Sequence, residues 1–191
     1  MPGSKRLILI VDGSPTLLYF RRAVMNVLLL SMPDSFEHTP TVAIRMPNGA
    51  LTSLAGNIDP HHRVAVADLI LVQERVRATI EDLLVKFQPD LVGLSVMTFQ
   101  RKTAKKIIDL VRAVKPGVLI AVGGYDPSMA PGAYTDSTHG TIDFIVRGEG
   151  EITFRELLRA VENNGGYERI LGLSYSEAGH FRHNSDRPVS S

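Results

Sequence analysis

The sequence contains no cysteine, and this absence excludes several kinds of chemistry. A chain without cysteine holds no disulfide, no thiolate zinc site, no cysteine nucleophile and no iron–sulfur cluster bound by its own thiolates. A large excess of charge of either sign is missing too, since the formal net charge is +1. We therefore expect neither nucleic acid nor an anionic membrane surface as a partner.

Long apolar segments and phosphate-binding motifs are also lacking. Runs such as residues 28–30 and 69–72 are far shorter than the roughly 20 apolar residues that cross a bilayer. No convincing signal-peptide cleavage site follows the apolar residues 7–11, so we expect a cytoplasmic protein. No lysine follows a Walker-type glycine motif, and no Ser/His/Asp arrangement is recognisable.

The residues that are present suit one globular domain with extra segments at its ends. Of the 191 residues, 44% are hydrophobic and 21% are charged. Short apolar runs alternate with helical periods, which is typical of an α/β protein with a mainly parallel sheet. The expected strands are residues 27–31, 64–69, 91–96, 118–122 and 142–146. The expected helices are residues 47–58, 76–87, 104–114 and 154–161.

Both ends of the chain lie outside this repeat. Residues 172–181 alternate like a hairpin with its turn near Ala178-Gly179. Residues 7–11 are predicted to form an extra strand, and Ser14, followed by Pro15, has the pattern of a helix N-cap. We therefore divide the chain into an N-terminal extension (1–26), a central domain (27–165) and a C-terminal hairpin and linker (166–191).

The loops that follow the strands form the candidate site, because ligands of open parallel sheets bind beyond the carboxyl ends of the strands. Ser95 lies at the end of the third strand, where its hydroxyl needs either a ligand or a backbone carbonyl as a partner. Gly123 and Gly124 end the fourth strand. Adjacent glycines let a large flat ligand approach the backbone, but a tight turn requires them equally well.

The turn after the fifth strand, GEGE at residues 148–151, combines two glycines with two carboxylates. Thr153 and Glu156 have the spacing of a capping box, so we predict that Thr153 caps the next helix and that Glu151 stabilises its positive end. Carboxylates repel phosphate, and too few other acids or histidines are near to complete a metal shell. Glu149 between glycines therefore predicts a ligand rich in hydrogen-bond donors.

The histidines are scattered along the chain. His61 and His62 lie in a polar turn before a strand, and His180 and His183 lie in the C-terminal hairpin. We expect all four side chains to be exposed and without function, and we predict no metal site.

Three segments taken together resemble the N-terminal cobalamin-binding domain of B12-dependent radical SAM proteins, namely residues 89–98, 122–124 and 143–154. The resemblance continues through residues 170–175. It implies a Rossmann-like, flavodoxin-like three-layer sandwich with a five-stranded, mainly parallel sheet. Cobalamin would lie at the carboxyl edge with its nucleotide tail inserted into the domain. The cofactor-binding residues that the resemblance implies are Ser95, Met97, Thr98, Gly123, Gly124, Tyr125, Gly148, Glu149 and Gly150.

The sequence also departs from known cobalamin proteins. The Asp-x-His-x-x-Gly loop that ligates cobalt in methionine synthase and the mutases is missing, and His38 does not have its spacing. The resemblance thus implies a base-off cobalt without a protein histidine. No Cys-x-x-x-Cys-x-x-Cys motif is present, so S-adenosylmethionine and a 4Fe–4S cluster would belong to a radical SAM domain in cis or in trans. We expect no catalysis from this chain alone.

Two other functions stay open. Residues 9–16 and 89–97 resemble parts of a response-regulator receiver, although Ser95 replaces the phosphoacceptor aspartate and Gly13 replaces an acidic residue. A degenerate receiver would be a signalling or interaction domain without a cofactor. The remaining alternative is an independent enzyme that uses a nucleotide or a flavin.

Overall fold

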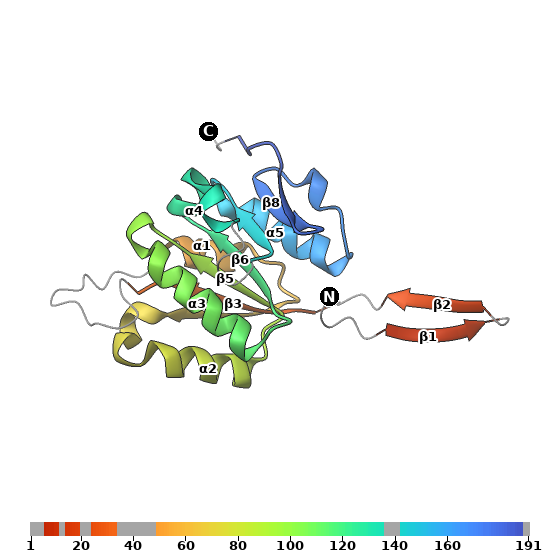
Figure 1. Cartoon of the computed structure of the whole chain (residues 1–191), viewed down its shortest axis with the longest axis horizontal. Coiled ribbons are helices and arrows are strands. Elements are labelled where there is room, and N and C mark those ends of the chain that lie inside the picture. The colour runs from red at the N-terminus through yellow and green to blue at the C-terminus, as the bar shows by residue number, and fades with distance from the viewer. Residues whose placement is uncertain (1–5, 12–13, 20–23, 34–48, 136–141, 189–191) are drawn as a thin grey trace.

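The computed structural model describes residues 6–11, 14–19, 24–33, 49–135 and 142–188, and its main body is a three-layer α/β sandwich (Figure 1). Seven strands form the central sheet in the order β4-β3-β5-β6-β7-β8-β9. The first five of that order are parallel, and β8 and β9 are antiparallel to their neighbours. The strands are β3 (Asn26–Ser31), β4 (Arg63–Asp68), β5 (Leu91–Ser95), β6 (Leu119–Gly123), β7 (Phe144–Val146), β8 (Leu173–Glu177) and β9 (His180–His183).

The five parallel strands confirm the predicted fold class. In chain order they are arranged 2-1-3-4-5, which is the flavodoxin-like order. Each of the five predicted strands is present within one or two residues of its expected bounds. The C-terminal hairpin is confirmed as well, with Ala178 and Gly179 at positive φ in its turn. Because β8 pairs with β7, the hairpin extends the same sheet to seven strands.

Helices cover both faces of the sheet. The helices are α1 (Gly49–Asn57), α2 (Val76–Phe87), α3 (Arg101–Val114), α4 (Tyr125–Met129) and α5 (Gly150–Glu162). Short 3₁₀ turns lie at η1 (Leu69–Arg75), η2 (Thr98–Gln100), η3 (Pro131–Tyr134) and η4 (Tyr167–Arg169). The α2 and α3 helices pack on one face, and α1 and α5 pack on the other (Figure 1).

Strand β3 shows how the sequence builds the two layers of core. Its side chains alternate, so Leu28 and Leu30 contact the α2 and α3 side while Val27 and Leu29 contact the α1 and α5 side. All four are fully buried. A strand that is covered on both faces needs a continuous apolar run, which residues 27–30 supply.

The helices follow the predicted periodicity. In α3, Ala104, Ile107, Ile108 and Val111 recur at helical spacing, and all are buried. The α2 helix ends where Gln88 adopts a left-handed conformation, directly before Pro89. Among the described helices, none combines the length and the apolar character required to cross a membrane.

The N-terminal segment corrects one prediction. The strand is confirmed as β1 (Arg6–Val11), but the segment from Ser14 forms a second strand, β2 (Ser14–Tyr19), instead of a helix. The two strands pair antiparallel, with Val11 opposite Ser14. The Asp-Gly dipeptide between them is a strong hairpin signal, and it outweighs the capping pattern of Ser14.

The same hairpin argues against the receiver hypothesis. A receiver needs residues 9–12 in the first strand of its parallel sheet. Here β1 and β2 form a separate two-stranded sheet, and the described residues contain no pairing between it and the central sheet.

Candidate functional site

An apolar pocket of about 100 Å³ lies at the carboxyl edge of the sheet, on the α1 and α5 side. Its floor consists of the ends of β5, β6 and β7, and its walls are α1 and the first turns of α5. The strand register brings the floor together, since Ser95 pairs with Gly123 and Gly123 pairs with Val146. The lining residues are Ala50, Leu51, Leu54, Gly93, Leu94, Ser95, Ala121, Val122, Gly123, Gly124, Val146, Gly148, Gly150, Glu151 and Phe154.

Glycine at position 124 is required by the backbone. Its φ of +98° and ψ of −168° are accessible almost only to glycine, and a Cβ would lie 2.9 Å from both Val96 N and Val96 O. At Gly123 an added Cβ would lie 3.2 Å from Val146 O. The glycine pair therefore forms a tight turn and also leaves the end of β6 free of side chains inside the pocket.

Glycines also keep the turn before α5 free of side chains. Gly148 has a φ of +70°, and a Cβ on Gly150 would point at Val146 Cγ1 (3.3 Å) and Leu54 Cδ1 (3.4 Å). Glycine at position 150 therefore keeps space between α1 and the sheet.

Ser128 of α4 joins the two glycine turns. Its Oγ donates to Gly124 O (2.7 Å) and accepts from Gly148 N (3.0 Å). The loops that follow β6 and β7 are thus held together directly, so the two halves of the glycine cradle keep a fixed relative position.

Five of the nine predicted site residues line the pocket, and four do not. The five are Ser95, Gly123, Gly124, Gly148 and Gly150. Of the others, Met97 and Tyr125 are exposed at 46% and 58%, and Thr98 and Glu149 also lie at the surface of the same edge. These four lie outside the pocket, on the rim of the carboxyl edge.

The capping-box prediction is wrong. The α5 helix begins at Gly150 with Glu149 as its N-cap residue, so Thr153 lies inside the first turns. Thr153 is fully buried and donates to Leu171 O (2.9 Å), and Glu156 pairs with Arg187. The helix starts at Gly150, three residues before Thr153. Glu151 then lies in the first turn, where its negative charge interacts favourably with the positive end of the helix dipole. The predicted position of Glu151 in this turn is confirmed.

The sequence did not predict that α1 forms one wall of the pocket. Ala50, Leu51 and Leu54 line the pocket, but periodicity alone does not show what the face of a helix covers. Gly93 carried a usable signal, because a glycine inside an apolar strand marks a close approach. A Cβ there would lie 2.8 Å from Leu29 Cδ2 and 3.7 Å from the Phe154 ring.

A partly buried ion pair, with Asp126 buried and Arg101 35% exposed, fixes the loops beside the pocket. Arg101 Nε and Nη2 donate to the two carboxylate oxygens of Asp126 at 2.7 and 2.6 Å, and Tyr134 OH donates to Asp126 Oδ2 at 2.6 Å. The hydrogen bonds from Arg101 lower the pKa of Asp126, whereas burial raises the pKa of Tyr134. This network holds α4, which carries Ser128, against α3.

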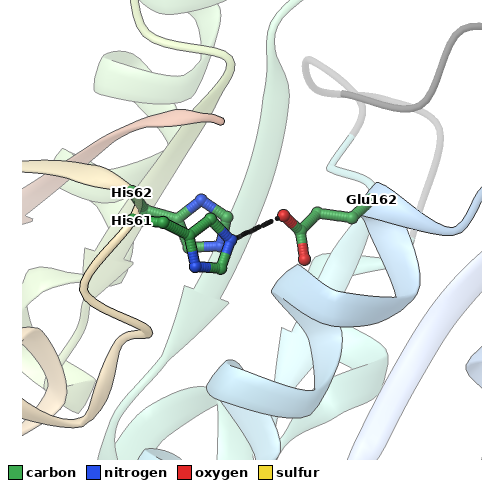
Figure 2. Close-up of side chains that lie close together, drawn as sticks. All are labelled: His61, His62 and Glu162. Atoms are coloured by element: carbon green, nitrogen blue, oxygen red, sulfur yellow. Dashed lines mark hydrogen bonds and ion pairs between the residues drawn. The ribbon is translucent and has the colours of Figure 1, made fainter. Parts of the chain in front are cut away.

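A second polar cluster lies at the opposite, amino-terminal edge of the sheet (Figure 2). His61 and His62 directly precede β4, and Glu162 ends α5. His61 Nε2 lies 2.8 Å and His62 Nε2 lies 3.8 Å from Glu162 Oε1. The expectation that these histidines are both exposed is wrong for His62, whose side chain is fully buried. Burial lowers the pKa of His62.

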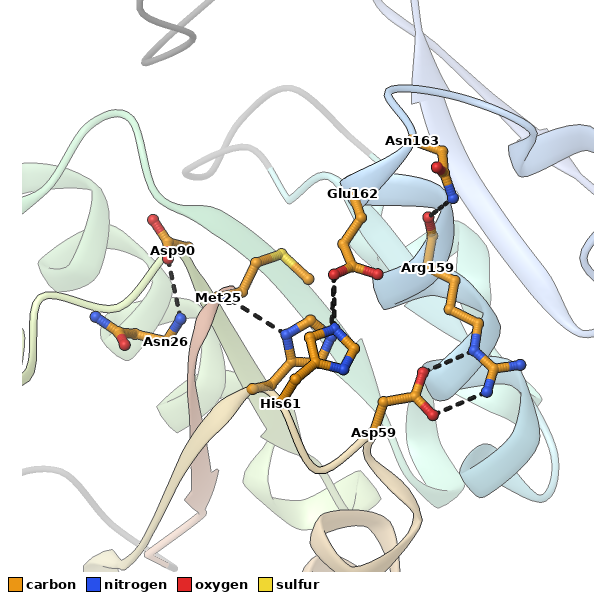
Figure 3. A network of polar contacts seen from close by, with 9 residues as sticks. Met25, Asn26, Asp59, His61, Asp90, Arg159, Glu162 and Asn163 are labelled. Atoms are coloured by element: carbon orange, nitrogen blue, oxygen red, sulfur yellow. Dashed lines mark hydrogen bonds and ion pairs between the residues drawn. The ribbon is translucent and has the colours of Figure 1, made fainter. Parts of the chain in front are cut away.

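The hydrogen bond that His62 accepts from Met25 argues against a metal ion at this cluster. Met25 N donates to His62 Nδ1 at 3.2 Å, so in the neutral ring the proton is on Nε2 (Figure 3). A metal ion would need the Nε2 lone pair, and moving the proton to Nδ1 would set it against the Met25 N–H. The neighbouring contact is an ion pair in which Arg159 donates to both oxygens of Asp59.

Comparison with known proteins assigns the family. The model of the B12 binding domain matches residues 39–158. An uncharacterised methyltransferase of Pyrococcus horikoshii is 31% identical over 166 residues, which cover 87% of this chain and 36% of that protein. The chain thus spans about a third of the length of this relative.

Two solved structures share the fold. The radical S-adenosylmethionine methyltransferase TsrM from Kitasatospora setae, with cobalamin and a 4Fe–4S cluster bound, has a TM-score of 0.70 and 20% identity over 85% of this chain and 31% of its own. The radical enzyme OxsB with aqua-cobalamin and S-adenosylmethionine bound has a TM-score of 0.69 and 24% identity over 87% of this chain and 23% of its own. The chain therefore belongs to the B12-binding domain family, as a cobalamin-binding domain like those of the cobalamin-dependent radical SAM enzymes.

Proposed function

We propose that the domain holds base-off cobalamin at the carboxyl edge of the sheet, with the nucleotide tail in the pocket between α1 and α5. The reacting face of the cofactor is then presented to a radical SAM domain, in cis or in trans, which performs methyl transfer or radical chemistry. S-adenosylmethionine and the 4Fe–4S cluster belong to that second domain, since this chain has no cysteine to ligate iron.

The observation that carries the proposal is the glycine-lined apolar slot. A cavity of about 150 Å³ lined by aliphatic and aromatic side chains accommodates a benzene ring, so a slot of about 100 Å³ has the scale of one flat ring and not of a whole corrin. The base of the nucleotide tail is flat, whereas the corrin must remain outside. Glycines at 123, 124 and 150 line the slot without contributing a side chain to it.

The polar groups at the slot suit the rest of the cofactor. Ser95 Oγ is the hydroxyl at the pocket floor, where it offers both a donor and an acceptor to the tail. Glu149 lies at the exposed edge, where a carboxylate accepts from the amide groups that surround the corrin. A tail base held in the slot cannot coordinate cobalt, so this placement corresponds to the base-off state. His38 lies outside the described residues.

Bound cobalamin supplies a cobalt centre that carries a methyl group or takes part in electron transfer. The contribution of this chain would be to shield the nucleotide tail from water and to orient the corrin at the carboxyl edge. Of the alternatives, a cofactor-free receiver would give the slot no role.

Titration with hydroxocobalamin tests the proposal, and cobinamide, which lacks the nucleotide tail, is the matched probe. We expect hydroxocobalamin to bind one to one, to co-elute with the protein and to take a base-off visible spectrum. Cobinamide should bind at least about tenfold more weakly, a difference equivalent to about 1.4 kcal/mol. An unchanged spectrum and no co-elution would refute the function, and equal affinities would refute the tail slot.

Two tryptophan variants of α1 test the slot by changing the protein instead of the ligand. Ala50 lines the slot but is exposed, so Ala50→Trp fills the slot without disturbing the core. Thr52→Trp places the same ring at an exposed position of the same helix, outside the slot. We expect Ala50→Trp to lose hydroxocobalamin binding and to keep its melting temperature, while Thr52→Trp binds like the wild type.

A further inference from the structure

The segment that follows the C-terminal hairpin contacts residues on either side of the glycine turn at the pocket, namely Arg147 before the turn and α5 after it. We name residues 184–187 the strap. It follows β9, and backbone hydrogen bonds fix its course, with Asn184 N donating to Leu173 O (3.0 Å) and Gly172 N donating to Ser185 O (2.8 Å). The pocket turn in question is residues 148–150, between β7 and α5.

On the β7 side, Arg147 holds the strap. This arginine directly precedes Gly148, and its side chain is only 13% exposed. Its guanidinium donates to Asp186 Oδ1 and to the backbone oxygen of Asn184. Its backbone N donates to Gly172 O (2.9 Å), so the same residue is tied to the hairpin and to the strap.

On the α5 side, Arg187 of the strap reaches back to the helix. Arg187 Nε donates to Thr153 Oγ1 (2.9 Å), and its Nη2 donates to Glu156 Oε2. The Arg187 side chain is 16% exposed, and Thr153 is fully buried. Glu156 is 38% exposed, so this charge-assisted pair lies between a surface pair and a buried one.

The hairpin and α5 are closely packed where they meet at Gly172. Gly172 has a φ of +77°, and a Cβ there would lie 3.0 Å from Arg147 O and 3.1 Å from Thr153 Oγ1. The backbone at Gly172 therefore packs directly against Arg147 and Thr153, with no room for a side chain between the hairpin and α5. Thr153 is one residue from Phe154 and two from Glu151, which both line the cofactor pocket.

We propose that the strap couples the occupancy of the cofactor pocket to the position of any polypeptide that follows residue 188, with Arg147 and Arg187 as positioning residues. A ligand that fills the slot contacts the first turn of α5 and the glycine turn, which are the two elements that the arginines hold. Ordering these elements stabilises the strap, and loss of the strap loosens the slot by the same coupling free energy. This inference rests on the proposed function.

Hydrogen exchange followed by mass spectrometry tests the coupling, on the full chain with and without hydroxocobalamin. In the wild type we expect hydroxocobalamin to slow exchange both at residues 150–156 and in the strap. In Arg187→Ala, exchange at both segments should rise about tenfold without ligand, because a charge-assisted bond is lost. Arg182→Ala is the control, since Arg182 pairs with Glu177 on the hairpin and both side chains are exposed.

The outcomes separate the inference from the proposed function. If the visible spectrum shows binding but strap exchange does not respond, the coupling is refuted and the function stands. If no cobalamin binds, the ligand-free comparison still decides the strap, because unchanged exchange at 150–156 in Arg187→Ala refutes it. Glu156→Ala and the double variant Arg187→Ala/Glu156→Ala complete a double-mutant cycle, in which a double variant no worse than Arg187→Ala supports the direct pair.

Discussion

Ser53 on α1 donates a hydrogen bond to Glu151 on α5, with 2.8 Å between Ser53 Oγ and Glu151 Oε1. The two residues are 98 positions apart in the sequence, and they belong to the two helices that wall the pocket. The bond is exposed, so it contributes little to folding. Its position suits it to limit how far α1 can move away from α5.

Removal of this bond should affect ligand release more than stability. We expect Ser53→Ala to lower the free energy of unfolding by less than about 1 kcal/mol. Hydroxocobalamin should dissociate several-fold faster from Ser53→Ala. The rate is measured by transfer of the ligand from the labelled variant to an excess of unlabelled wild-type protein. Ser53→Thr keeps the hydroxyl and serves as the control. A dissociation rate identical in all three proteins would show that the bond does not restrain the wall.

Two glycines of the cradle should differ sharply in their tolerance of alanine. Gly124→Ala combines an unfavourable backbone region with contacts of 2.9 Å to the Val96 backbone, so we expect a loss of at least about 3 kcal/mol or no soluble protein. Gly148→Ala meets no atom within 4 Å and carries only the cost of its φ of +70°, about 1 kcal/mol. Urea denaturation of the two variants measures the difference. Equal losses would contradict the assigned role of Gly124.

The ion pair of Asp126 predicts an acid-sensitive loss of stability. Arg101 lowers the pKa of Asp126 below 3.8, so the folded state binds fewer protons than the unfolded state in this range. The stabilisation is present above pH 4 and is lost as the pH falls from about 3.8 through the folded-state value. Asp126→Asn should lower stability at pH 7 by about 2–3 kcal/mol, less than a fully buried pair because Arg101 is 35% exposed.

Denaturation of both proteins between pH 2 and pH 7 provides the measurement. The stability difference between the wild type and Asp126→Asn should shrink as the pH falls through that window. A constant difference would mean that the carboxylate charge is not the stabilising feature.

The buried His62 predicts a second pH effect at a higher range. Burial lowers its pKa below 6.5, against the opposing charges of Glu162 and Asp59 and with the neighbouring His61 acting in the same direction as burial. Below pH 6.5 the unfolded state therefore binds a proton that the folded state does not, and stability decreases as the pH falls. His62→Gln should flatten this slope as the pH falls from about 7 to 5. A wild-type slope retained in His62→Gln would assign the effect to other groups.

The sequence predicted those features that depend on local pattern. Alternation and apolar runs located the five parallel strands, and the strand ends directed attention to Ser95 and to the glycines at 123–124 and 148–150, because parallel strands bring their carboxyl ends to one edge. These signals come from neighbouring residues in the chain. A single sequence is sufficient to detect them.

The features that were missed depend on tertiary contacts. Thr153 and Glu156 have capping-box spacing, but Arg187, more than 30 residues further along the chain, recruits both side chains. His62 is hydrophilic by type, but the backbone N–H of Met25 provides a buried partner for its ring. The slot itself lies between α1 and glycines of β5, of β6 and of the turns that follow β6 and β7, and no local pattern contains that arrangement.

The hairpin of β8 and β9 has a consequence for solubility. Without it, the three-residue strand β7 would be an open edge of the sheet, with the unpaired backbone of Phe144, Ile145 and Val146 available to another chain. With it, the outer strand of that side is β9, whose residues His180, Phe181, Arg182 and His183 present charge and polarity at the boundary. A chain truncated after residue 165 should therefore aggregate by edge-to-edge strand pairing, even though the apolar pocket at the carboxyl edge lies wholly before the cut.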